Sequence, residues 1–174
     1  MRHKWKCVLS AALLYAEATA CEPDSTAIQY LAAIDAMDCD AMRSHLAEDA
    51  TYTDPTMTHF GTDAIDLTGA NNVVEFWRSS SEDSGTSEIK YTITSCLETA
   101  GYHAVNLDIL ISVSSAYWCV NKDVIDIPGR VVSIIRVQDG RVIEHDDYVE
   151  YAAADKVVAK LREKYGEAKG ETSD

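Results

Sequence analysis

The amino-acid sequence predicts a single α+β domain in which helices come first and antiparallel strands follow. Apolar residues recur at helical spacing through residues 25–38 and again, more briefly, around Met42 and Leu46. From Glu88 onward, apolar and polar residues alternate, which is typical of strands with one buried face. Helices followed by a run of strands indicate an α+β fold, and a curved sheet packed on the helices would leave a concave face able to hold a ligand.

Three helix starts carry a residue whose side chain can accept a hydrogen bond from a free backbone N–H of the first turn. These residues are Asp24 or Ser25, Asp38 or Asp40, and Asn71 or Asn72. The third helix is expected to carry Val73, Val74, Phe76 and Trp77, and residues 152–165 have the composition of a final helix.

The strand signals begin at Ala50–Tyr52 and stop at Asp54-Pro55, because proline cannot donate to a strand ladder. Residues 56–72 are interpreted as irregular and residues 79–87 as a polar loop. Further strands are expected at residues 89–95, 103–114, 116–120, 130–138 and 141–151.

The turn at Asp139-Gly140 decides which side chains of the last two strands face the core. A tight two-residue turn would pair Val137 with Val142, whereas a turn with a glycine bulge would pair Val137 with Arg141. The bulged form separates apolar from polar residues more cleanly, so we predict it. It places on the inner face Val131, Ser133, Ile135, Val137, Ile143, His145, Asp147 and Val149, with Ser133 across from His145.

A carboxylate on that apolar face is a candidate acid or base. Burial among Val131, Ile143 and Val149 would raise the pKa of Asp147 and suit it to proton transfer. The alternative is a buried aspartate that is hydrogen-bonded to a tyrosine or to the backbone. His145, on the same face, is expected to be a core or rim histidine beside the ligand.

Composition limits the classes of partner. The chain has 174 residues, which corresponds to one domain with tails, and its 47% apolar content allows a sizeable core. A formal net charge of −14 argues against nucleic acid or an anionic membrane as the main partner. Neutral small molecules suit such a protein best.

The cysteines give no metal signature by spacing. The five are Cys7, Cys21, Cys39, Cys96 and Cys119. No CxxC and no Cys/His pair at metal-ligand spacing is present, so no metal site is predicted. The last three can form at most one disulfide, whose pairing the sequence leaves open, and core packing is the default expectation for each.

The first twenty residues have the pattern of an export signal. A basic segment is followed by the short apolar run Val8–Ala16 and by Ala18-Thr19-Ala20, which fits a cleavage site. The apolar run is too short to span a bilayer, and the rival interpretation is an ordinary N-terminal helix. Cys21 follows as in a lipoprotein cleavage box, but Ala18 replaces the usual leucine, so lipidation is the minor alternative.

We therefore expect an exported protein, secreted or periplasmic, without a membrane span. Residues 1–20 would form a signal peptide, residues 24–165 the domain and residues 166–174 a polar tail.

Two segments resemble a known family. ATYTDP (Ala50–Pro55) and DGRVIEHDDYVEY (Asp139–Tyr151), with the order of helices and strands, resemble the nuclear transport factor 2-like superfamily. It includes ketosteroid isomerases, SnoaL-type polyketide cyclases and limonene epoxide hydrolase. The resemblance covers about Thr26–Tyr151. It implies a cone-shaped, strongly bent antiparallel or mixed sheet closed by the N-terminal helices, and it makes a homodimer plausible.

The resemblance to ketosteroid isomerases implies three site residues. Tyr30 falls on the oxyanion-hole tyrosine and Asp54 on the catalytic base, in the same Asp-Pro dipeptide. Ser133 falls where the family has a protonated aspartic acid as second donor. The implied chemistry is removal of a proton beside a carbonyl while hydrogen-bond donors stabilise the enolate.

The resemblance to SnoaL-type cyclases implies Asp147 instead, in the segment His145–Tyr148, as general acid/base of an intramolecular aldol closure. Limonene epoxide hydrolase adds an arginine and an aspartate on a preceding strand, where this chain has Tyr117 and Cys119, so epoxide hydrolysis is not expected. Position suggests apolar pocket walls and polar ligand contacts from Trp77, Tyr117, Trp118, His59 and Asn106.

Taken together, the residues and the resemblance predict an exported, cofactor-free protein with a small hydrophobic pocket. It would act as an isomerase or cyclase on a carbonyl compound. The alternative is a non-catalytic ligand-binding or assembly domain of the same fold. A cavity lined by both carboxylates favours the enzyme, and a cone filled with side chains favours the alternative.

Overall fold

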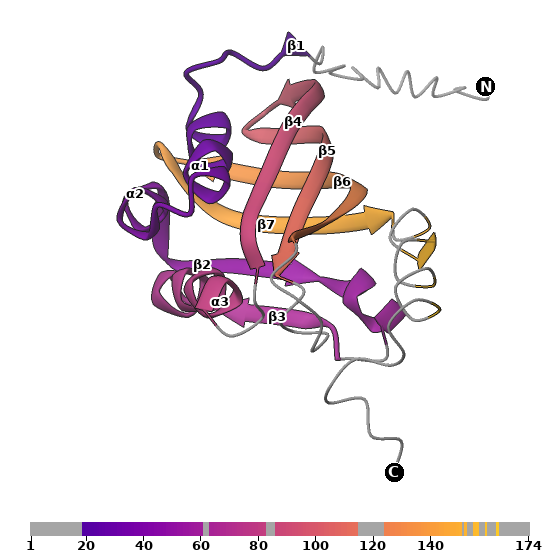
Figure 1. Cartoon of the computed structure of the whole chain (residues 1–174). Coiled ribbons are helices and arrows are strands. Elements are labelled where there is room, and N and C mark those ends of the chain that lie inside the picture. The colour runs from indigo at the N-terminus through magenta and orange to yellow at the C-terminus, as the bar shows by residue number, and fades with distance from the viewer. Residues whose placement is uncertain are drawn as a thin grey trace, which may run out of the picture.

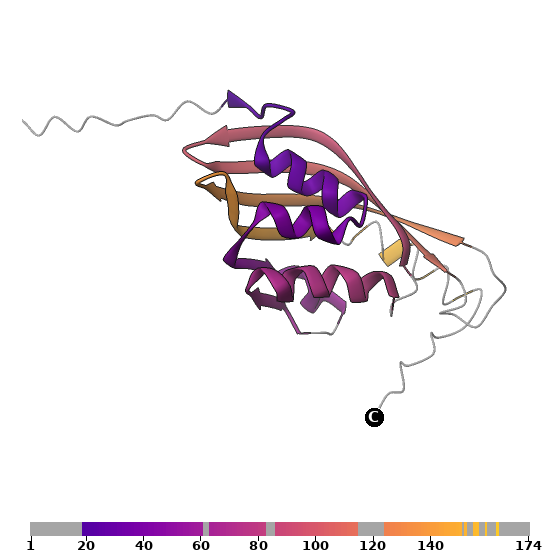
Figure 2. The same cartoon turned by 90° about the vertical axis from the view of Figure 1, so that its left-hand side faces the viewer.

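Three helices lie on one face of a mixed sheet in the computed structural model of the chain (Figures 1 and 2). The structure describes residues 19–60, 63–82, 86–114 and 124–150, together with Ala152, Asp155, Lys156, Ala159 and Glu163. Within these residues the predicted α+β class and the bent mixed sheet are confirmed.

The sheet has seven strands in the order β1-β4-β5-β6-β7-β2-β3. Their bounds are β1 Thr19–Ala20, β2 Leu46–Asp54, β3 Ile65–Thr68, β4 Thr86–Thr99, β5 Tyr102–Ser114, β6 Val124–Gln138 and β7 Arg141–Glu150. Neighbours run antiparallel except β2 and β7, which are parallel. In Figure 1, β4 and β5 run steeply while β7 and β2 run across the view, so the sheet is strongly bent. Register shifts in β2, in β4 and at Ile143 of β7 contribute to the bend, because bulges increase strand twist.

The helices are α1 (Thr26–Asp35), α2 (Cys39–His45) and α3 (Ala70–Glu82), with a 3-10 helix η1 (Pro55–Phe60) after β2. Figure 2 shows the three α-helices side by side against the sheet. Of the two caps predicted for α2, Asp38 is the one used, since its carboxylate accepts a hydrogen bond from the Ala41 N–H at 3.0 Å.

The prediction that residues 56–72 are irregular is wrong. They contain η1 and the edge strand β3, which pairs antiparallel with the end of β2. β3 has only four residues, so its alternation is too short to stand out in the sequence.

Helix α3 begins earlier and ends later than predicted. It starts after Gly69, whose carbonyl accepts from the Asn72 and Val73 N–H groups, and not after a cap at Asn71 or Asn72. The Asn72 side chain instead donates to the Thr68 carbonyl. The helix extends to Glu82, into the predicted polar loop.

The hairpin between β6 and β7 also departs from the predicted register. Asp139 and Gly140 have φ angles of 51° and 74°, which belong to a two-residue turn of type I′. Val137 therefore pairs with Val142, and not with Arg141. The bulge lies outside the turn, because the register shifts between Arg136 and Val137.

This bulge returns Ser133, His145 and Asp147 to the predicted inner face, but it changes which residues lie opposite one another. Ser133 lies opposite Asp147, and not opposite His145. Val142 is fully buried, whereas Ile143 is only half-buried, contrary to the prediction. Ser133, His145 and Asp147 all point inward and are buried.

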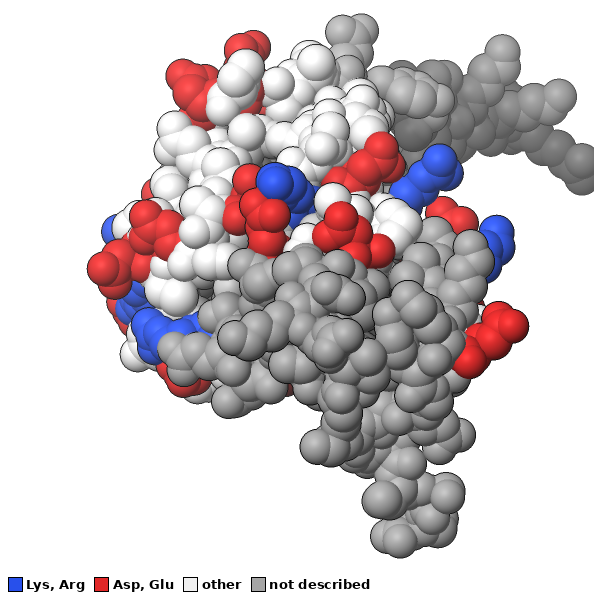
Figure 3. Space-filling model, viewed as in Figure 1, with Lys and Arg blue, Asp and Glu red and all other residues white. Residues whose placement is uncertain are grey.

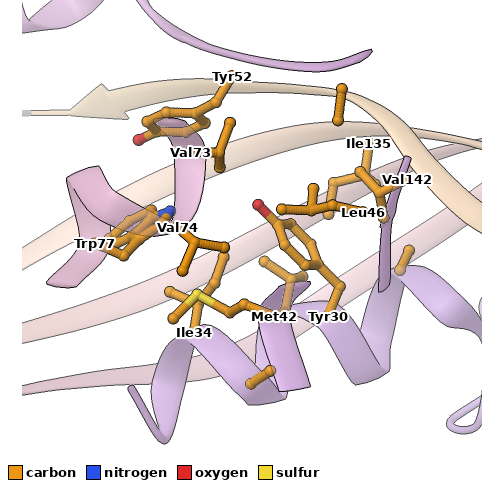
Figure 4. Close-up of a cluster of buried hydrophobic side chains, with 14 of the residues drawn as sticks. Tyr30, Ile34, Met42, Leu46, Tyr52, Val73, Val74, Trp77, Ile135 and Val142 are labelled. Carbon is orange, nitrogen blue, oxygen red and sulfur yellow. The ribbon is translucent and has the colours of Figure 1, made fainter. Parts of the chain in front are cut away.

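The core fills the space between the helices and the concave face of the sheet. Figure 4 shows side chains from α1, α2, α3 and the strands meeting there, among them Tyr30, Met42, Trp77 and Ile135. The Tyr30 side chain is fully buried, and its hydroxyl points into this cluster. Burial of these helix faces holds α1 and α3 over the sheet.

Cys39 and Cys96 pack against the core, as expected, but Cys96 also forms a disulfide. Cys96, on β4, is bonded to Cys21, and Cys39 is the free cysteine among the described residues. The predicted strand at residues 116–120, the signal-peptide cleavage pattern up to Ala18 and the polar tail lie outside the described residues. The five described residues of the predicted final helix are helical.

Acidic side chains predominate on the surface, as the net charge of −14 requires. Figure 3 shows them over the described part of one face, with few basic groups between them. Among the described residues, no helix is both long and apolar enough to cross a membrane.

Candidate functional site

A cavity of about 250 Å³ lies between helix α3 and the concave face of the sheet. Its wall is largely apolar, with Phe76 and Trp77 from α3 facing side chains of β4, β5 and β6. Two carboxylates, Asp54 at the end of β2 and Asp147 in β7, also line it. Both are almost fully buried, with exposed fractions of 3% and 4%. Two buried carboxylates at one apolar cavity are the arrangement from which acid–base chemistry can be built.

Asp147 is held by three hydrogen-bond donors. The Ser133 hydroxyl donates to Oδ1 at 2.5 Å, and the Tyr52 hydroxyl donates to Oδ2 at 3.2 Å. His145 Nε2 lies 2.9 Å from Oδ1. The sheet creates this cluster, because Ser133 is the cross-strand neighbour of Asp147 and His145 is two residues away on the same face of β7.

These donors reverse the predicted shift of the Asp147 pKa. Burial works to raise the pKa, as expected, but the His145 charge and the hydrogen bonds from His145, Ser133 and Tyr52 outweigh it. The pKa of Asp147 is therefore lowered, and the prediction of a raised pKa is wrong. The alternative of a buried aspartate hydrogen-bonded to a tyrosine is confirmed by Tyr52, and the sequence had placed Ser133 and His145 on the same face without showing that they contact Asp147.

His145 connects Asp147 to Tyr30. An ionised carboxylate can only accept hydrogen bonds, so Nε2 of His145 carries the proton of the contact with Asp147. The other ring nitrogen, Nδ1, lies 3.3 Å from the Tyr30 hydroxyl oxygen, within hydrogen-bonding distance. Burial and the Asp147 charge raise the pKa of Tyr30 far above its usual range, so this hydroxyl stays protonated. The result is a buried chain of contacts from Tyr30 through His145 to Asp147.

Asp54 is fixed by the turn that follows it. Its Oδ1 accepts hydrogen bonds from the backbone N–H and the hydroxyl of Thr56. The Thr56 hydroxyl oxygen in turn accepts from the Val149 N–H at 3.0 Å. The Asp-Pro sequence that ends β2 thus ties Asp54 to β7, the strand that carries Asp147.

Tyr52 is a site residue that the sequence analysis missed. It lines the cavity, donates to Asp147 and packs against the Trp77 ring with centroids 5.5 Å apart. Burial and the Asp147 charge raise the pKa of Tyr52 well above its ordinary value, so it is a hydroxyl donor. Its position two residues before Asp54, on the same face of β2, is the signal that could have identified it.

The structure brings some predicted site residues to the cavity and places others elsewhere. Asp54, Asp147 and Trp77 line it. Tyr30, Ser133 and His145 are buried and do not line it: Ser133 and His145 contact Asp147, and Tyr30 contacts His145. Asn106 lies on the opposite, exposed face of β5 and donates to Ser95, and the exposed His59 pairs with Asp155 at 2.9 Å. Tyr117 and Trp118 lie outside the described residues.

Comparison with protein families identifies the family of this chain. The family described as "SnoaL-like domain" matches residues 27–145, about two thirds of the chain. The chain belongs to the SnoaL-like domain family. Asp147 lies two residues beyond the matched region. A search of curated proteins returned no match.

Solved structures show the same fold. A SnoaL-like protein from Shewanella denitrificans OS-217, provisionally named a polyketide cyclase, has a TM-score of 0.66 at 17% identity. The match covers 78% of this chain and 95% of that one. A protein from Kribbella flavida DSM 17836, provisionally named a ketosteroid isomerase, has a TM-score of 0.54 at 18% identity over 73% and 76% of the two chains.

An NTF2-like protein of unknown function from Burkholderia pseudomallei K96243 has a TM-score of 0.57 at 18% identity, with 79% and 92% of the two chains covered. At these identities the likeness shows the fold, which is that of the nuclear transport factor 2-like proteins and which includes small-molecule-binding members. The predicted family is therefore confirmed.

Proposed function

We propose that this SnoaL-like protein is a cofactor-independent isomerase or cyclase that removes a proton beside a carbonyl group of a small apolar molecule. The observation that carries the proposal is the pairing of Asp54 and Asp147 at one largely apolar cavity. Both carboxylates are fixed by hydrogen bonds, so neither has to be reoriented for proton transfer.

Asp147 is the better supported base. Because its pKa is lowered, it is ionised at neutral pH and is in the form that accepts a proton. Tyr30, the oxyanion donor implied by the resemblance to isomerases, contacts His145 and does not line the cavity. The geometry therefore fits the role implied by the cyclase resemblance more closely than the isomerase one, with Asp54 as the second carboxylate that returns the proton.

The lowered pKa also bears on the substrate. A weaker base needs a more acidic C–H bond to reach the same rate. A carbon between two carbonyl groups, as in a 1,3-dicarbonyl compound, meets this requirement better than a simple ketone. The cavity of about 250 Å³ is slightly below the usual range for drug-sized ligands, which favours a small substrate.

In the proposed step, an oxygen of Asp147 takes the proton from the carbon beside the carbonyl, and the C–H electron pair passes into an enolate. The enolate then either regains a proton at another carbon, which is isomerisation, or attacks a second carbonyl in the same molecule, which is cyclisation. The Tyr52 hydroxyl lines the same cavity and donates to ionised Asp147, so it becomes available to donate to the enolate once Asp147 has taken the proton.

Turnover of a panel of small 1,3-diketones, β-keto esters and β,γ-unsaturated ketones tests the proposal. Asp147→Asn should lower kcat by about 100-fold or more, since a general base contributes roughly 10²–10⁴. Asp146→Asn is the matched control, because Asp146 is the next residue and bonds to Thr53 on the other face of the sheet. If neither Asp147→Asn nor Asp54→Asn slows a detected reaction tenfold, the mechanism is wrong.

The non-catalytic alternative makes a different prediction in the same panel. A binding domain would bind carbonyl compounds without turnover, and both aspartate variants would change affinity alone. The presence of two buried carboxylates in the cavity wall is the reason to prefer the enzyme, because desolvating them has a cost that an apolar binding site would avoid.

Export remains part of the proposal. Cleavage after Ala20 would remove β1 and make Cys21 the first residue, and the disulfide to Cys96 would then fix the new N-terminus to β4. A disulfide is in keeping with an oxidising compartment. The same bond argues against lipid anchoring, because a Cys21 sulfur bonded to Cys96 cannot also carry a lipid thioether. Mass spectrometry of the mature N-terminus tests this, and an intact Met1 in the native host would exclude it.

A further inference from the structure

A second cluster of chemically reactive side chains lies at the far edge of the sheet from the cavity. Cys21, Cys96 and His103 each place one potential ligand atom within 4.8 Å of the other two. Cys21 follows β1, Cys96 lies in β4 and His103 in β5. The cluster has no part in the proposed acid–base chemistry.

The sheet register explains how the cluster forms. β1 pairs with β4 through Thr19↔Glu98 and Ala20↔Leu97, which places Cys21 beside Cys96 with Cα atoms 5.4 Å apart. His103 lies opposite Glu98 and is therefore the diagonal neighbour of Cys96 on one face of the sheet. No sequence spacing predicts this group, because 75 residues separate the two cysteines.

His103 carries the independent observation. Its side chain is buried, with 3% exposed, yet Nδ1 makes no hydrogen bond in the described part of the structure. A buried imidazole nitrogen without a hydrogen bond is uncommon and needs an explanation. The Glu98 carboxylate lies 3.7 Å from Nδ1, beyond hydrogen-bonding distance but near enough to act as a further ligand.

We propose that, when the Cys21–Cys96 disulfide is reduced, the two thiolates and His103 bind a zinc ion, with Glu98 or a water molecule in the fourth position. Two thiolates and an imidazole are preferred zinc ligands. Neighbouring ligand atoms around a tetrahedral zinc ion lie roughly 3.3–3.8 Å apart, given bond lengths of about 2.0–2.3 Å. Because the three atoms already lie within 4.8 Å of one another, separation of the two sulfurs is the main movement needed.

Electrons and protons balance in the conversion between the disulfide form and the zinc-bound form. A dithiol reductant transfers two electrons and two protons to the disulfide and becomes a cyclic disulfide itself, leaving two thiols on the protein. Zinc then displaces the two thiol protons as it binds. A disulfide oxidant removes two electrons from the thiolates, reforms the Cys21–Cys96 bond and releases the zinc ion. The N-terminal segment is held on β4 in either form, by sulfur or by metal.

Metal titration of the full chain tests this proposal. Because the chain has five cysteines, we would replace Cys7, Cys39 and Cys119 by serine and reduce the remaining pair with a phosphine. The reduced protein should bind one Co²⁺ with thiolate-to-cobalt charge-transfer and tetrahedral absorption bands, and Zn²⁺ should displace it. The disulfide form should bind neither ion at the same concentration.

His103→Gln separates the proposed site from ordinary thiol binding. It leaves both thiols in place and should weaken Zn²⁺ affinity at least tenfold, with a change in the cobalt spectrum, while the oxidised variant keeps the wild-type fold by circular dichroism. Cys96→Ser should abolish the charge-transfer bands of the site. Absence of a stoichiometric Co²⁺ complex in the reduced protein, or unchanged affinity in His103→Gln, would overturn the proposal.

Discussion

The contact between His145 and Asp147 makes the sharpest prediction about the site's stability. His145→Leu removes the proton donor to Asp147 and the hydrogen-bond partner of the Tyr30 hydroxyl in a fully buried location. A lost hydrogen bond to a charged group costs about 1.5–3 kcal/mol and a lost neutral one about 0.5–1.5 kcal/mol, so the sum is roughly 2–4.5 kcal/mol. Removing one partner of a buried ion pair costs about 3–5 kcal/mol, so the two estimates overlap at about 3–4.5 kcal/mol.

Urea unfolding at pH 7 with the disulfide intact measures this cost, and a double-mutant cycle isolates the contact. Ser133→Ala is the matched control, since it removes one other donor from the same oxygen and should cost about 1.5–3 kcal/mol. The cycle of His145→Leu and Asp147→Asn should show a coupling of about 1–3 kcal/mol. A loss below about 1 kcal/mol for His145→Leu, or additivity within about 0.5 kcal/mol, would show that the two side chains do not support each other.

Three further predictions concern stability. Gly101 has φ +82° and an added Cβ would lie 2.7 Å from the Val137 carbonyl oxygen, so Gly101→Ala should cost clearly more than the roughly 1–2 kcal/mol of left-handed backbone alone. Gly140 has φ +74° and open space around it, so Gly140→Ala should cost only the roughly 1–2 kcal/mol of left-handed backbone. If urea unfolding gave the same loss of unfolding free energy for both variants, the clash at Gly101 would be contradicted. The paired replacement Cys21→Ser and Cys96→Ser opens a link across 75 residues and should lower the free energy of unfolding by roughly 4 kcal/mol, whereas Cys39→Ser should leave it nearly unchanged. Because the pKa of folded Asp147 lies below the ordinary 3.8, its ionised form contributes stability above about pH 4 that is lost as pH falls through the folded pKa. The free energy of unfolding should therefore fall more steeply as the pH drops from about 4 to about 2 in the wild type than in Asp147→Asn, and equal slopes would contradict the lowered pKa.

The fold could be predicted because its signals are local or periodic. Helical spacing located α1 and α2, and alternation located β4 to β7. The edge strand β3 was missed because four residues carry little periodicity, and it is defined by pairing with β2. The hairpin register was wrong because the two forms compared put any bulge in the turn, whereas the actual bulge lies beyond the turn, where no glycine marks it.

The site could be predicted only in part, because its chemistry depends on contacts between distant segments. Asp54 and Asp147 were identified from local patterns and family resemblance, and both line the cavity. The pKa of Asp147 is lowered first by His145, two residues away, and then by Ser133 and Tyr52, which lie 14 and 95 residues away in the sequence. The cluster of Cys21, Cys96 and His103 is likewise assembled by strand pairing and has no recognisable spacing.

Deuterium exchange is the most direct test of the central claim that a cavity carboxylate removes a proton beside a carbonyl. A small 1,3-diketone or β-keto ester is incubated in D₂O with each protein, and mass spectrometry follows deuterium entering the activated carbon. The wild type and the control Asp146→Asn should accelerate this exchange equally above the buffer rate, and Asp147→Asn should slow the accelerated part about 100-fold or more. Equal exchange catalysed by the wild type and by Asp147→Asn would contradict the assignment of Asp147 as the base.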